Sequence, residues 1–364
     1  MEATAQQDLV KTILADFPVP LEQLTFRPFG SGLINSTYLV NCGGRQYILQ
    51  KINQAVFRHP EYIAENVKLI NDYLHDKHPE YLFISPLLTR NRQNMFWSEA
   101  MGFYRLTPFV PDSQSIDVVE NAAEAFESAS QFARFTAKLA GFDSQQLKIT
   151  LPDFHNLQLR YDQFRATLAT GNTARIEEAR EAIRYIESQV SIVSGYEAIC
   201  SRSDLYPLRV MHHDTKISNV LLDKNRKGIC VIDLDTVMPG YFFSDVGDML
   251  RTYLSPVSEE EKDYSKISIR VPIFEAIVKG YFQEMHNELT TAEKEHFIFA
   301  GKIMIYMQAI RFLTDYINND VYYGAKYPNH NFVRAGNQLQ LLRKLNESEP
   351  ALQQILTQQI NAHK

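Results

Sequence analysis

The chain has 364 residues, of which 45% are apolar and 22% are charged, and this balance is that of an ordinary globular protein large enough for two lobes. Its formal net charge of −6 gives no general electrostatic attraction to nucleic acid or to an anionic membrane, which leaves small molecules or proteins as the expected partners. The three cysteines, Cys42, Cys200 and Cys230, show neither a disulfide framework nor the spacing of metal ligands.

The N-terminal segment does not combine a basic stretch with an apolar core, so we expect no secretion signal. We also find no apolar run long enough to span a bilayer. Together with the sparse cysteines, these features predict a cytoplasmic protein, and we expect a monomer or a weak homodimer.

The first hundred residues alternate between helical and β patterns. Residues 5–17 predict a short amphipathic helix, and residues 24–52 predict strands separated by glycine and asparagine turns. Residues 60–76 have a helical period and begin with Pro60, which is favourable at a first helical position. The stretches "LFISPLL" and "MGFYRLTPFV" predict two further strands. Residues 24–110 therefore predict a small antiparallel sheet with one helix inserted.

Beyond residue 112 the pattern is mainly helical. Residues 117–140 and 155–200 predict long helices interrupted at Gly141 and Gly171, and the pattern from 241 onward is helical again. Between them, "NVLLD" and "GICVIDLDTV" predict a short β-hairpin. We expect an α+β, two-lobed fold. A small antiparallel β-rich N-terminal lobe spans 1–108, a large, mainly helical C-terminal lobe spans 109–364, and a connector near 105–112 joins them.

The predicted hairpin follows the polar stretch "VMHHDTKISNVLL". His212, Asp214 and Asn219 fit H-x-D-x-x-x-x-N, and Asp233 ends an apolar run fourteen residues after Asn219. Phosphoryl transfer needs a carboxylate beside the attacking hydroxyl and oxygen ligands for Mg²⁺ on the nucleotide phosphates. Two aspartates and an asparagine at this spacing supply both needs. We therefore predict a catalytic loop rather than turn residues and a strand cap, with His212 bracing the loop.

The segment "DLDTV", residues 233–237, permits a second interpretation. It fits D-x-D-x-[TV], the nucleophile motif of haloacid-dehalogenase-like phosphatases, and a buried strand precedes it as that fold requires. Such an enzyme would form an aspartyl-phosphate at Asp233. However, the following 130 residues are mostly helical and show no run of parallel strands, so we favour the kinase interpretation.

Three other features each have a structural and a functional interpretation. "GSGLINSTYLV", residues 30–40, predicts a glycine-containing turn that is either a plain hairpin or a cover over phosphates. Asp245 either caps a helix or holds the catalytic loop from beneath. Arg311 lies in an apolar helical stretch and either pairs with Asp315 at i, i+4 or faces a substrate. His213 is expected to be a loop residue.

These motifs resemble the aminoglycoside phosphotransferase and choline kinase group, which are relatives of the protein kinases. Within that group the chain is similar to the N-acetylhexosamine 1-kinases. The resemblance runs from about residue 24 to about residue 345 and is carried by "GSGLINSTYLV", "YILQKIN", "HHDTKISNVLLD", "VIDLDTVMPG" and "RFLTDYINNDVYYGAKYPNHN". It implies a protein-kinase-like fold and ATP- and Mg²⁺-dependent phosphorylation of the anomeric hydroxyl of N-acetylglucosamine or N-acetylgalactosamine.

The resemblance also implies roles for individual residues. Asp214 would take the proton from the anomeric hydroxyl, and Asn219 and Asp233 would hold Mg²⁺. Arg311 and Tyr322 would face the sugar. Supporting positions would be His212, Asp235 and Asp245. The nucleotide contacts would come from Gly30, Ser31, Gly32, Asn35, Ser36, Gln50, Leu106 and Val110.

The sequence departs from the family pattern at two positions. Kinase strands usually supply a lysine to the nucleotide phosphates, but the strand register places Gln50 there and turns Lys51 to the other face. Leu33 stands where the best-matching relatives carry a histidine near the sugar, so the choice of sugar stays open.

Two alternatives within the same fold remain. A pseudokinase that only binds partners would explain Gln50, although the intact set Asp214, Asn219 and Asp233 argues against it. An aminoglycoside or choline-type kinase is the nearest alternative. It would be expected to carry an acidic cleft for its cationic substrate, and we see no acidic cluster beyond the catalytic residues.

Overall fold

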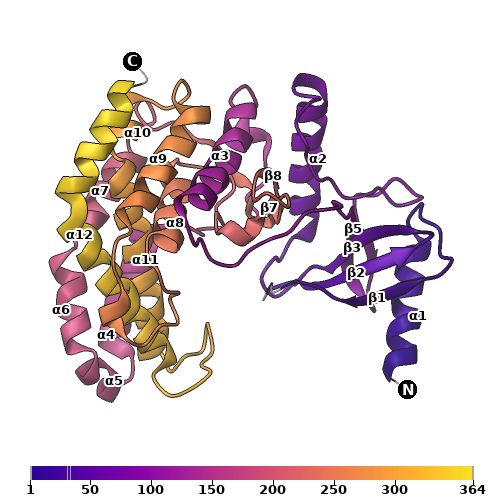
Figure 1. Ribbon diagram of the computed structural model, residues 1–364. Helices are drawn as coiled ribbons and strands as arrows, with labels where there is room; N and C mark the ends of the chain where they lie inside the picture. Colours follow the sequence, from indigo (N-terminus) through magenta and orange to yellow (C-terminus); the bar gives the residue numbers. More distant parts are fainter. Residues whose placement is uncertain (1, 31, 33, 363–364) are drawn as a thin grey trace. The chain divides into compact units, whose positions relative to one another are not determined.

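The computed structural model describes residues 2–30, 32 and 34–362. These residues form two compact units. The first, which we call the sheet lobe, comprises residues 1–113, 142–152 and 232–238. The second, which we call the helical lobe, comprises residues 114–141, 153–231 and 239–364. Figure 1 shows the elements of both.

The sheet lobe is built around an antiparallel sheet. Its strands lie in the order β1-β2-β3-β5-β4, and each neighbouring pair is antiparallel. The predicted small antiparallel N-terminal lobe is thereby confirmed. The elements are α1 (Glu2–Ala15), β1 (Thr25–Pro28), β2 (Ser36–Cys42), β3 (Arg45–Lys51), α2 (Pro60–Lys77), β4 (Phe96–Ser98), β5 (Gly102–Pro108) and the short 3-10 helices η1 (Ser144–Gln146) and η3 (Leu234–Thr236).

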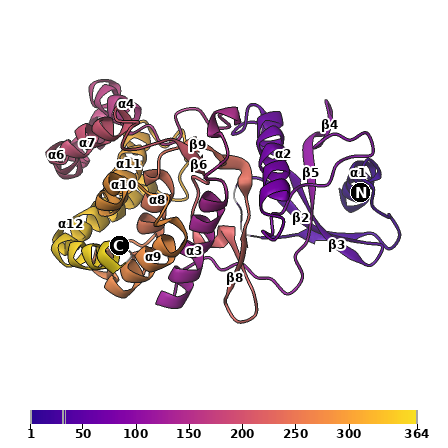
Figure 2. The same cartoon turned by 90° about the horizontal axis from the view of Figure 1, so that it is seen from above.

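The sheet separates two helices. Figures 1 and 2 both show α1 on one side of the sheet and α2 on the other. Helix α1 and the turn after it bury Ile13, Leu14 and Phe17 against residues such as Leu49 and Leu106 on one sheet face. Because side chains alternate across a strand, the intervening residues of β3 and β5 point to the opposite face.

Two short segments from later in the sequence belong to the sheet lobe. The buried Asn66 of α2 donates to the carbonyls of Lys148 and Val237, at 2.8 and 3.0 Å, and accepts from the Lys148 N–H at 2.7 Å. This buried amide therefore ties both segments to α2. The predicted boundary at 108–109 assumed that each lobe is formed by one continuous part of the chain. A sequence pattern does not reveal that residues 142–152 and 232–238 pack with the sheet lobe.

The helical lobe confirms the expected large helical C-terminal lobe. Helix α11 packs against α4, α8 and α12, and α3 packs against α9. The helices are α3 (Ala122–Lys138), α4 (Leu157–Thr170), α5 (Thr173–Glu178), α6 (Arg180–Ser188), α7 (Ser191–Cys200), α8 (Phe243–Tyr253), α9 (Val271–Met285), α10 (Thr291–Glu295), α11 (Phe297–Ile317) and α12 (His330–Ala362), with 3-10 turns η2 (Ile217–Asn219) and η4 (Tyr264–Lys266).

Short strands interrupt this helical lobe. The predicted hairpin is present, with β7 (Val220–Leu222) antiparallel to β8 (Gly228–Val231). Strands β6 (Arg209–Met211) and β9 (Met238–Gly240) pair with each other and were not predicted, because three-residue strands carry too little periodicity.

The strand predicted at residues 82–88 is wrong. This segment runs beside β5 with a hydrogen bond from the Leu87 N–H to the Leu106 carbonyl at 2.7 Å, but it forms no regular strand. Pro86 has no N–H to donate, which explains why a ladder does not extend along it. The strand that pairs with β5 on this side is β4, which lies later in the chain.

The expectation about membrane-spanning runs also needs correction. Helix α11 is long and apolar enough to cross a membrane by length and composition. However, 72% of its most apolar window is buried inside the protein. A helix that is apolar all round is the normal solution for the centre of a large helical lobe, so packing accounts for the composition of α11.

We predict that Phe17→Ala destabilises the sheet lobe by about 3–5 kcal/mol, because a fully buried ring would leave a cavity between α1 and the sheet. Denaturant unfolding would measure the change. Lys11→Ala alters an exposed position of the same helix and serves as the control. Equal, small effects of both substitutions would contradict the packing of α1 described here.

Candidate functional site

The H-x-D-x-x-x-x-N loop lies between β6 and β7 of the helical lobe. Its backbone is held by two aspartates from the first two turns of α8. Asp245 accepts hydrogen bonds from the N–H groups of His212 and His213 at 3.0 and 2.7 Å. Asp248 accepts from the Thr215 N–H at 2.9 Å. Two buried carboxylates therefore fix the backbone on both sides of Asp214.

The buried position of Asp245 affects its ionisation. Burial raises its pKa to about 7, although the two backbone N–H groups oppose the rise, and the negative charges of Asp248 and Asp214 add to it. The carboxyl group is thus balanced between its protonated and ionised forms near neutral pH. The geometry is the one expected for a residue that supports the loop from beneath.

Asp214 is surrounded by donors. The Asn219 amide donates to its carboxylate at 3.0 Å and to its carbonyl at 2.9 Å, and the Lys216 ammonium lies 2.9 Å from the same carboxylate. Burial acts to raise the pKa of Asp214, but Lys216, His212 and Asn219 outweigh it and lower the pKa. The carboxylate is therefore ionised at neutral pH, as a proton acceptor must be.

The two histidines of the loop are structural neighbours of Asp214. The ring of His212 is fully buried, 5.0 Å from Phe132, and its Nδ1 accepts from the Asp214 N–H at 3.4 Å. His213 has a φ of 66°, and its ring lies so close to Gly240 that a Cβ there would be 2.4 Å from it. The absence of a side chain at Gly240 therefore leaves room for the His213 ring.

In the sheet lobe, Asp233 precedes η3 and adopts a left-handed backbone with a φ of 61°. Such a conformation is uncommon outside glycine and is often found at functional sites. Two residues later, the buried Asp235 forms an ion pair with Arg105 of β5 and accepts from the Asn35 amide at 2.6 Å. Arg105 in turn donates to Gln50 at 2.9 Å. No sequence pattern indicated Arg105, because its contact with Asp235 joins two segments 130 residues apart.

The glycine turn before β2 is described in part. Gly30 has a φ of +78°, and a Cβ at Gly30 or Gly32 would meet no atom within 4 Å. Asn35 also accepts from the Asn53 N–H at 3.0 Å, and Ser36 is exposed at the start of β2. Ser31 and Leu33 lie outside the described residues.

The connector after β5 differs from the prediction in one respect. Leu106 is still inside β5, with its side chain in the core and its carbonyl bonded to the Leu87 N–H. Val110 follows the strand, and its carbonyl accepts from the Ser113 hydroxyl at 2.7 Å. Among the described residues, nothing accepts from the Val110 N–H.

The candidate metal ligands can be tested against the chemistry of Mg²⁺. The amide nitrogen of Asn219 donates to Asp214, so its side-chain oxygen is the atom of a kind that Mg²⁺ binds, and the side chain of Asp233 is a carboxylate. In the described part of the chain, no three His, Cys, Asp or Glu side chains cluster to hold a metal alone. Mg²⁺ is usually bound through one or two protein oxygens together with substrate phosphates, and each of these two side chains, taken by itself, is of a type that can serve as such a ligand.

Arg311 projects from α11 into a group of aromatic rings. Its guanidinium lies 6.0 Å from the rings of Phe154 and Tyr322 and 5.5 Å from that of Tyr323. The alternative Arg311–Asp315 pair is absent from the described residues. Asp315 instead accepts from the N–H groups of Tyr322 and Tyr323, at 2.7 and 2.9 Å. It thereby positions this pair of tyrosines, of which Tyr322 is 74% exposed.

Sequence reasoning missed three residues of this group, Phe154, His155 and Arg160. The His155 ring stacks on Phe154 at 4.4 Å, and its Nδ1 lies 3.4 Å from that of His213. Burial, together with the positive charges of His213 and the arginines, lowers the pKa of His155, so its ring is neutral. Phe154 and His155 precede α4 and Arg160 lies in its first turn, in a stretch without a recognisable motif, and only the fold brings these residues together.

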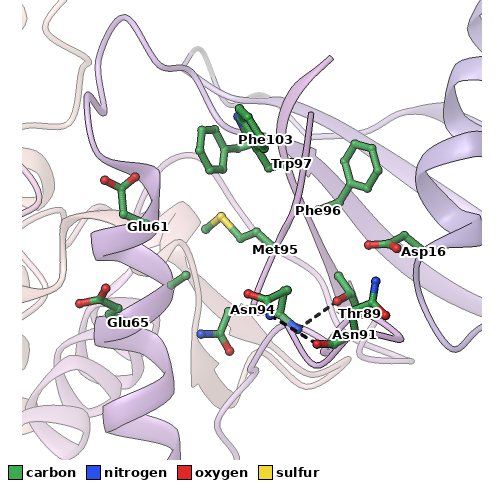
Figure 3. Close-up of a pocket in the computed structure, with 12 residues that line it drawn as sticks. Asp16, Glu61, Glu65, Thr89, Asn91, Asn94, Met95, Phe96, Trp97 and Phe103 are labelled. Atoms are coloured by element: carbon green, nitrogen blue, oxygen red, sulfur yellow. Dashed lines mark hydrogen bonds between the residues drawn. The ribbon is translucent and has the colours of Figure 1, made fainter. Parts of the chain in front are cut away.

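A separate cavity of about 510 Å³ lies in the sheet lobe, and Figure 3 shows its lining. Glu61 and Glu65 of α2 face it on one side, and Met95 and Trp97 face it on the other. None of the predicted site residues contributes to it.

We predict that Asp245→Asn lowers stability by about 1–3 kcal/mol, because an amide leaves one of the two backbone N–H groups without an acceptor. The turnover number should also fall, by more than the loss of folded protein explains, because Asp214 is displaced. Denaturant unfolding and steady-state kinetics would measure both. Asp204→Asn removes a charge from an exposed position and is the control. Wild-type turnover in Asp245→Asn would contradict the support described here.

Comparison with known proteins agrees with this architecture. An amicoumacin kinase is 15% identical over 94% of this chain and 96% of its own, with a TM-score of 0.62. An aminopropanol kinase is 16% identical over 95% and 98%, with a TM-score of 0.61. Choline kinase from Cryptosporidium parvum is 14% identical over 94% and 97%, with a TM-score of 0.55. Identities this low establish the protein-kinase-like fold alone. The family model of the phosphotransferase enzyme family matches residues 25–266, and the chain therefore belongs to that family.

Proposed function

We propose that this protein is an ATP- and Mg²⁺-dependent kinase that phosphorylates the anomeric hydroxyl of an N-acetylhexosamine. Membership of the phosphotransferase family supports the reaction class. The positive charge of Arg160 and Arg311, among the aromatic rings of the helical lobe, supports the acceptor class. A cytoplasmic, monomeric or weakly dimeric enzyme is part of the same proposal, and its three free cysteines suit a reducing compartment.

Arg160 and Arg311 give this group a surplus of positive charge. Burial and the charge of Arg311 lower the pKa of the Arg160 guanidinium, although Tyr322, Tyr323 and Asp153 oppose the fall. Within the described residues, neither arginine forms an ion pair with a carboxylate. Arg160 donates to Gln163 and to the Asp153 carbonyl, and Arg311 reaches Gln308 at 3.4 Å. A cationic acceptor such as choline or an aminoglycoside would be repelled here.

A sugar with an acetamido group suits the same surroundings. Guanidinium N–H groups donate to hydroxyl and carbonyl oxygens, and the rings of Phe154, Tyr322 and Tyr323 offer apolar faces to the C–H surface of a sugar. The neutral His155 ring can donate from one nitrogen and accept at the other. The group therefore recognises polar, uncharged oxygens rather than ammonium groups.

The reaction asks mainly for positioning. The ionised Asp214 accepts the proton of the anomeric hydroxyl as that oxygen attacks the γ-phosphorus of ATP and the bond to the ADP oxygen breaks. Asn219 orients the Asp214 carboxylate through its amide. Asn219 and Asp233 would hold Mg²⁺, which supplies positive charge to the phosphates. The amicoumacin kinase structure contains AMP-PNP and Ca²⁺, a nucleotide and a divalent ion of the classes proposed here.

We predict that Asp214→Asn lowers kcat by about 10²- to 10⁴-fold, because it removes the proton acceptor while keeping the shape of the side chain. ATP affinity should stay within a few-fold of wild type. Steady-state kinetics and nucleotide titration would separate the two quantities. Unchanged kcat in this variant would remove Asp214 from the proposed role.

Phosphorus NMR with ATP, Mg²⁺ and a panel of acceptors tests the substrate class. We expect a sugar 1-phosphate and equimolar ADP with N-acetylglucosamine or N-acetylgalactosamine. The methyl glycoside of the same sugar should give no product, because its anomeric oxygen is blocked. Choline and kanamycin should be inert because of Arg160 and Arg311.

The other outcomes of this panel are equally informative. Phosphorylation of choline or kanamycin would keep the fold and the catalytic loop but discard the proposed acceptor. Phosphorylation of the methyl glycoside would move the reacting hydroxyl away from the anomeric carbon. ADP formed with no acceptor in the panel would leave the acceptor class open to another alcohol.

A further inference from the structure

The sheet lobe lacks the lysine that kinases use to neutralise the nucleotide phosphates from strand β3. In β3 the register pairs Gln50 with Arg105 and Lys51 with Tyr104. Residues directly opposite each other share a face, so Gln50 and Arg105 point to one side and Lys51 and Tyr104 to the other. The Lys51 ammonium lies 5.8 Å from the Tyr104 ring in an exposed position. Lys51 therefore does not replace the missing charge by a slip of register.

The acidic partner that kinases place on the helix after this strand is missing as well. The buried polar residue of α2 is Asn66, which is bonded to Lys148 and Val237. Glu61 pairs with His59, and Asp72 pairs with Lys68, while Glu65 lines the cavity of Figure 3. Among the described residues, no acid of α2 reaches Gln50 or Lys51. Both members of the usual lysine–glutamate pair are absent from their usual positions.

A different cation–carboxylate pair occupies the Gln50 face. Arg105 is 4% exposed and Asp235 is 2% exposed, and they form a direct ion pair. Burying a guanidinium is costly unless its charge is balanced and its donors are used. Its Nε donates to Gln50 at 2.9 Å and its Nη1 to Asp235. The Nη2 group has no partner among the described residues, which leaves two N–H donors for a ligand.

We propose that Arg105 supplies, from β5, the positive charge that other kinases supply by a lysine of β3, and that its Nη2 group binds the nucleotide phosphates. This inference rests on the proposed use of ATP but not on the identity of the acceptor. Asp235 balances the charge of Arg105 when no nucleotide is bound. Arginine suits this position because its planar fork can bind a carboxylate and a phosphate at the same time.

The same arrangement explains why residue 50 is a glutamine. A lysine at this position would place a second ammonium directly opposite a buried guanidinium, and like charges repel strongly at low dielectric. The glutamine instead accepts from Arg105 and donates to the Thr37 hydroxyl at 3.1 Å. Gln50 is therefore a positioning residue that fixes the plane of the guanidinium.

The pair also connects the segments predicted to meet the phosphates. Asn35, in the turn before β2, donates to Asp235 at 2.6 Å, and Asp235 lies two residues after the candidate metal ligand Asp233. Arg105 thus lies where the turn before β2, strand β3 and the "DLD" segment meet, and all three belong to the sheet lobe.

Isothermal titration of ADP and adenosine, without acceptor, tests the proposal. Arg105→Met should weaken ADP binding by about 10- to 100-fold, because a charge-assisted contact to the phosphates is lost. Adenosine binding should stay within a few-fold of wild type, because adenosine has no phosphate. Lys51→Met removes a lysine from the opposite face and should change neither affinity.

Two double variants separate charge from structure. Arg105→Met leaves Asp235 buried without a partner and can unfold the lobe. Arg105→Met with Asp235→Leu replaces the pair by apolar side chains, and thermal unfolding checks that it is folded. It should still show the selective loss of ADP affinity. Adding Gln50→Lys to Arg105→Met restores a cation at the facing position and should recover at least about tenfold of the lost affinity.

Several outcomes would overturn the proposal. Equal weakening of ADP and adenosine would make Arg105 a structural residue. Wild-type ADP affinity in the folded apolar double variant would show that the charge is not used. A selective loss in Lys51→Met would assign the phosphates to the other strand face. If wild-type protein binds no nucleotide at all, the proposed kinase function itself fails, and this result is distinguishable from the other three.

Discussion

The conformation of the H-x-D-x-x-x-x-N loop depends on one buried carboxylate. Asp245 accepts two consecutive backbone N–H groups, and this bidentate contact holds His213 in a left-handed conformation that its side chain would otherwise disfavour. Asp214 is the next residue, so its direction is set by a carboxylate that it does not touch. Helix α8 packs on α11, so the packing of the helical lobe also holds the loop in place. A reaction that relies on positioning benefits from such an anchor.

The two lobes differ in whether their arginines are paired with carboxylates. In the sheet lobe, Arg105 is balanced by Asp235 and oriented by Gln50, which is the arrangement of a cation that must remain buried before its ligand arrives. In the helical lobe, Arg160 and Arg311 are surrounded by rings and neutral groups and have no carboxylate partner in the described residues. Two arginines without carboxylate partners favour ligands that are rich in oxygen atoms. An arginine that is balanced by a carboxylate can instead bind a single strongly charged ligand.

Family membership fixes the chemistry and leaves the acceptor to local detail. Solved kinases of this fold have acceptors as different as choline and amicoumacin, so the fold cannot specify a sugar. In this chain the distinguishing detail is that neither Arg160 nor Arg311 forms an ion pair with a carboxylate within the described residues. Asp315, the nearest acid in sequence, is turned away to hold the backbone of Tyr322 and Tyr323. The acid thus shapes this group of residues without contributing charge to it.

The sequence by itself determined the two-lobed fold, the H-x-D-x-x-x-x-N loop with Asp214 and Asn219, and the position of Asp245 beneath that loop. These features depend on local spacing and on alternation of apolar residues, which a single sequence displays directly. It even determined that Lys51 points away from Gln50, because side chains alternate along a strand. Only the tertiary structure revealed Arg105, His155 and Arg160. Each acquires its meaning from a partner distant in sequence, such as the 130 residues between Arg105 and Asp235, and no local pattern encodes that proximity.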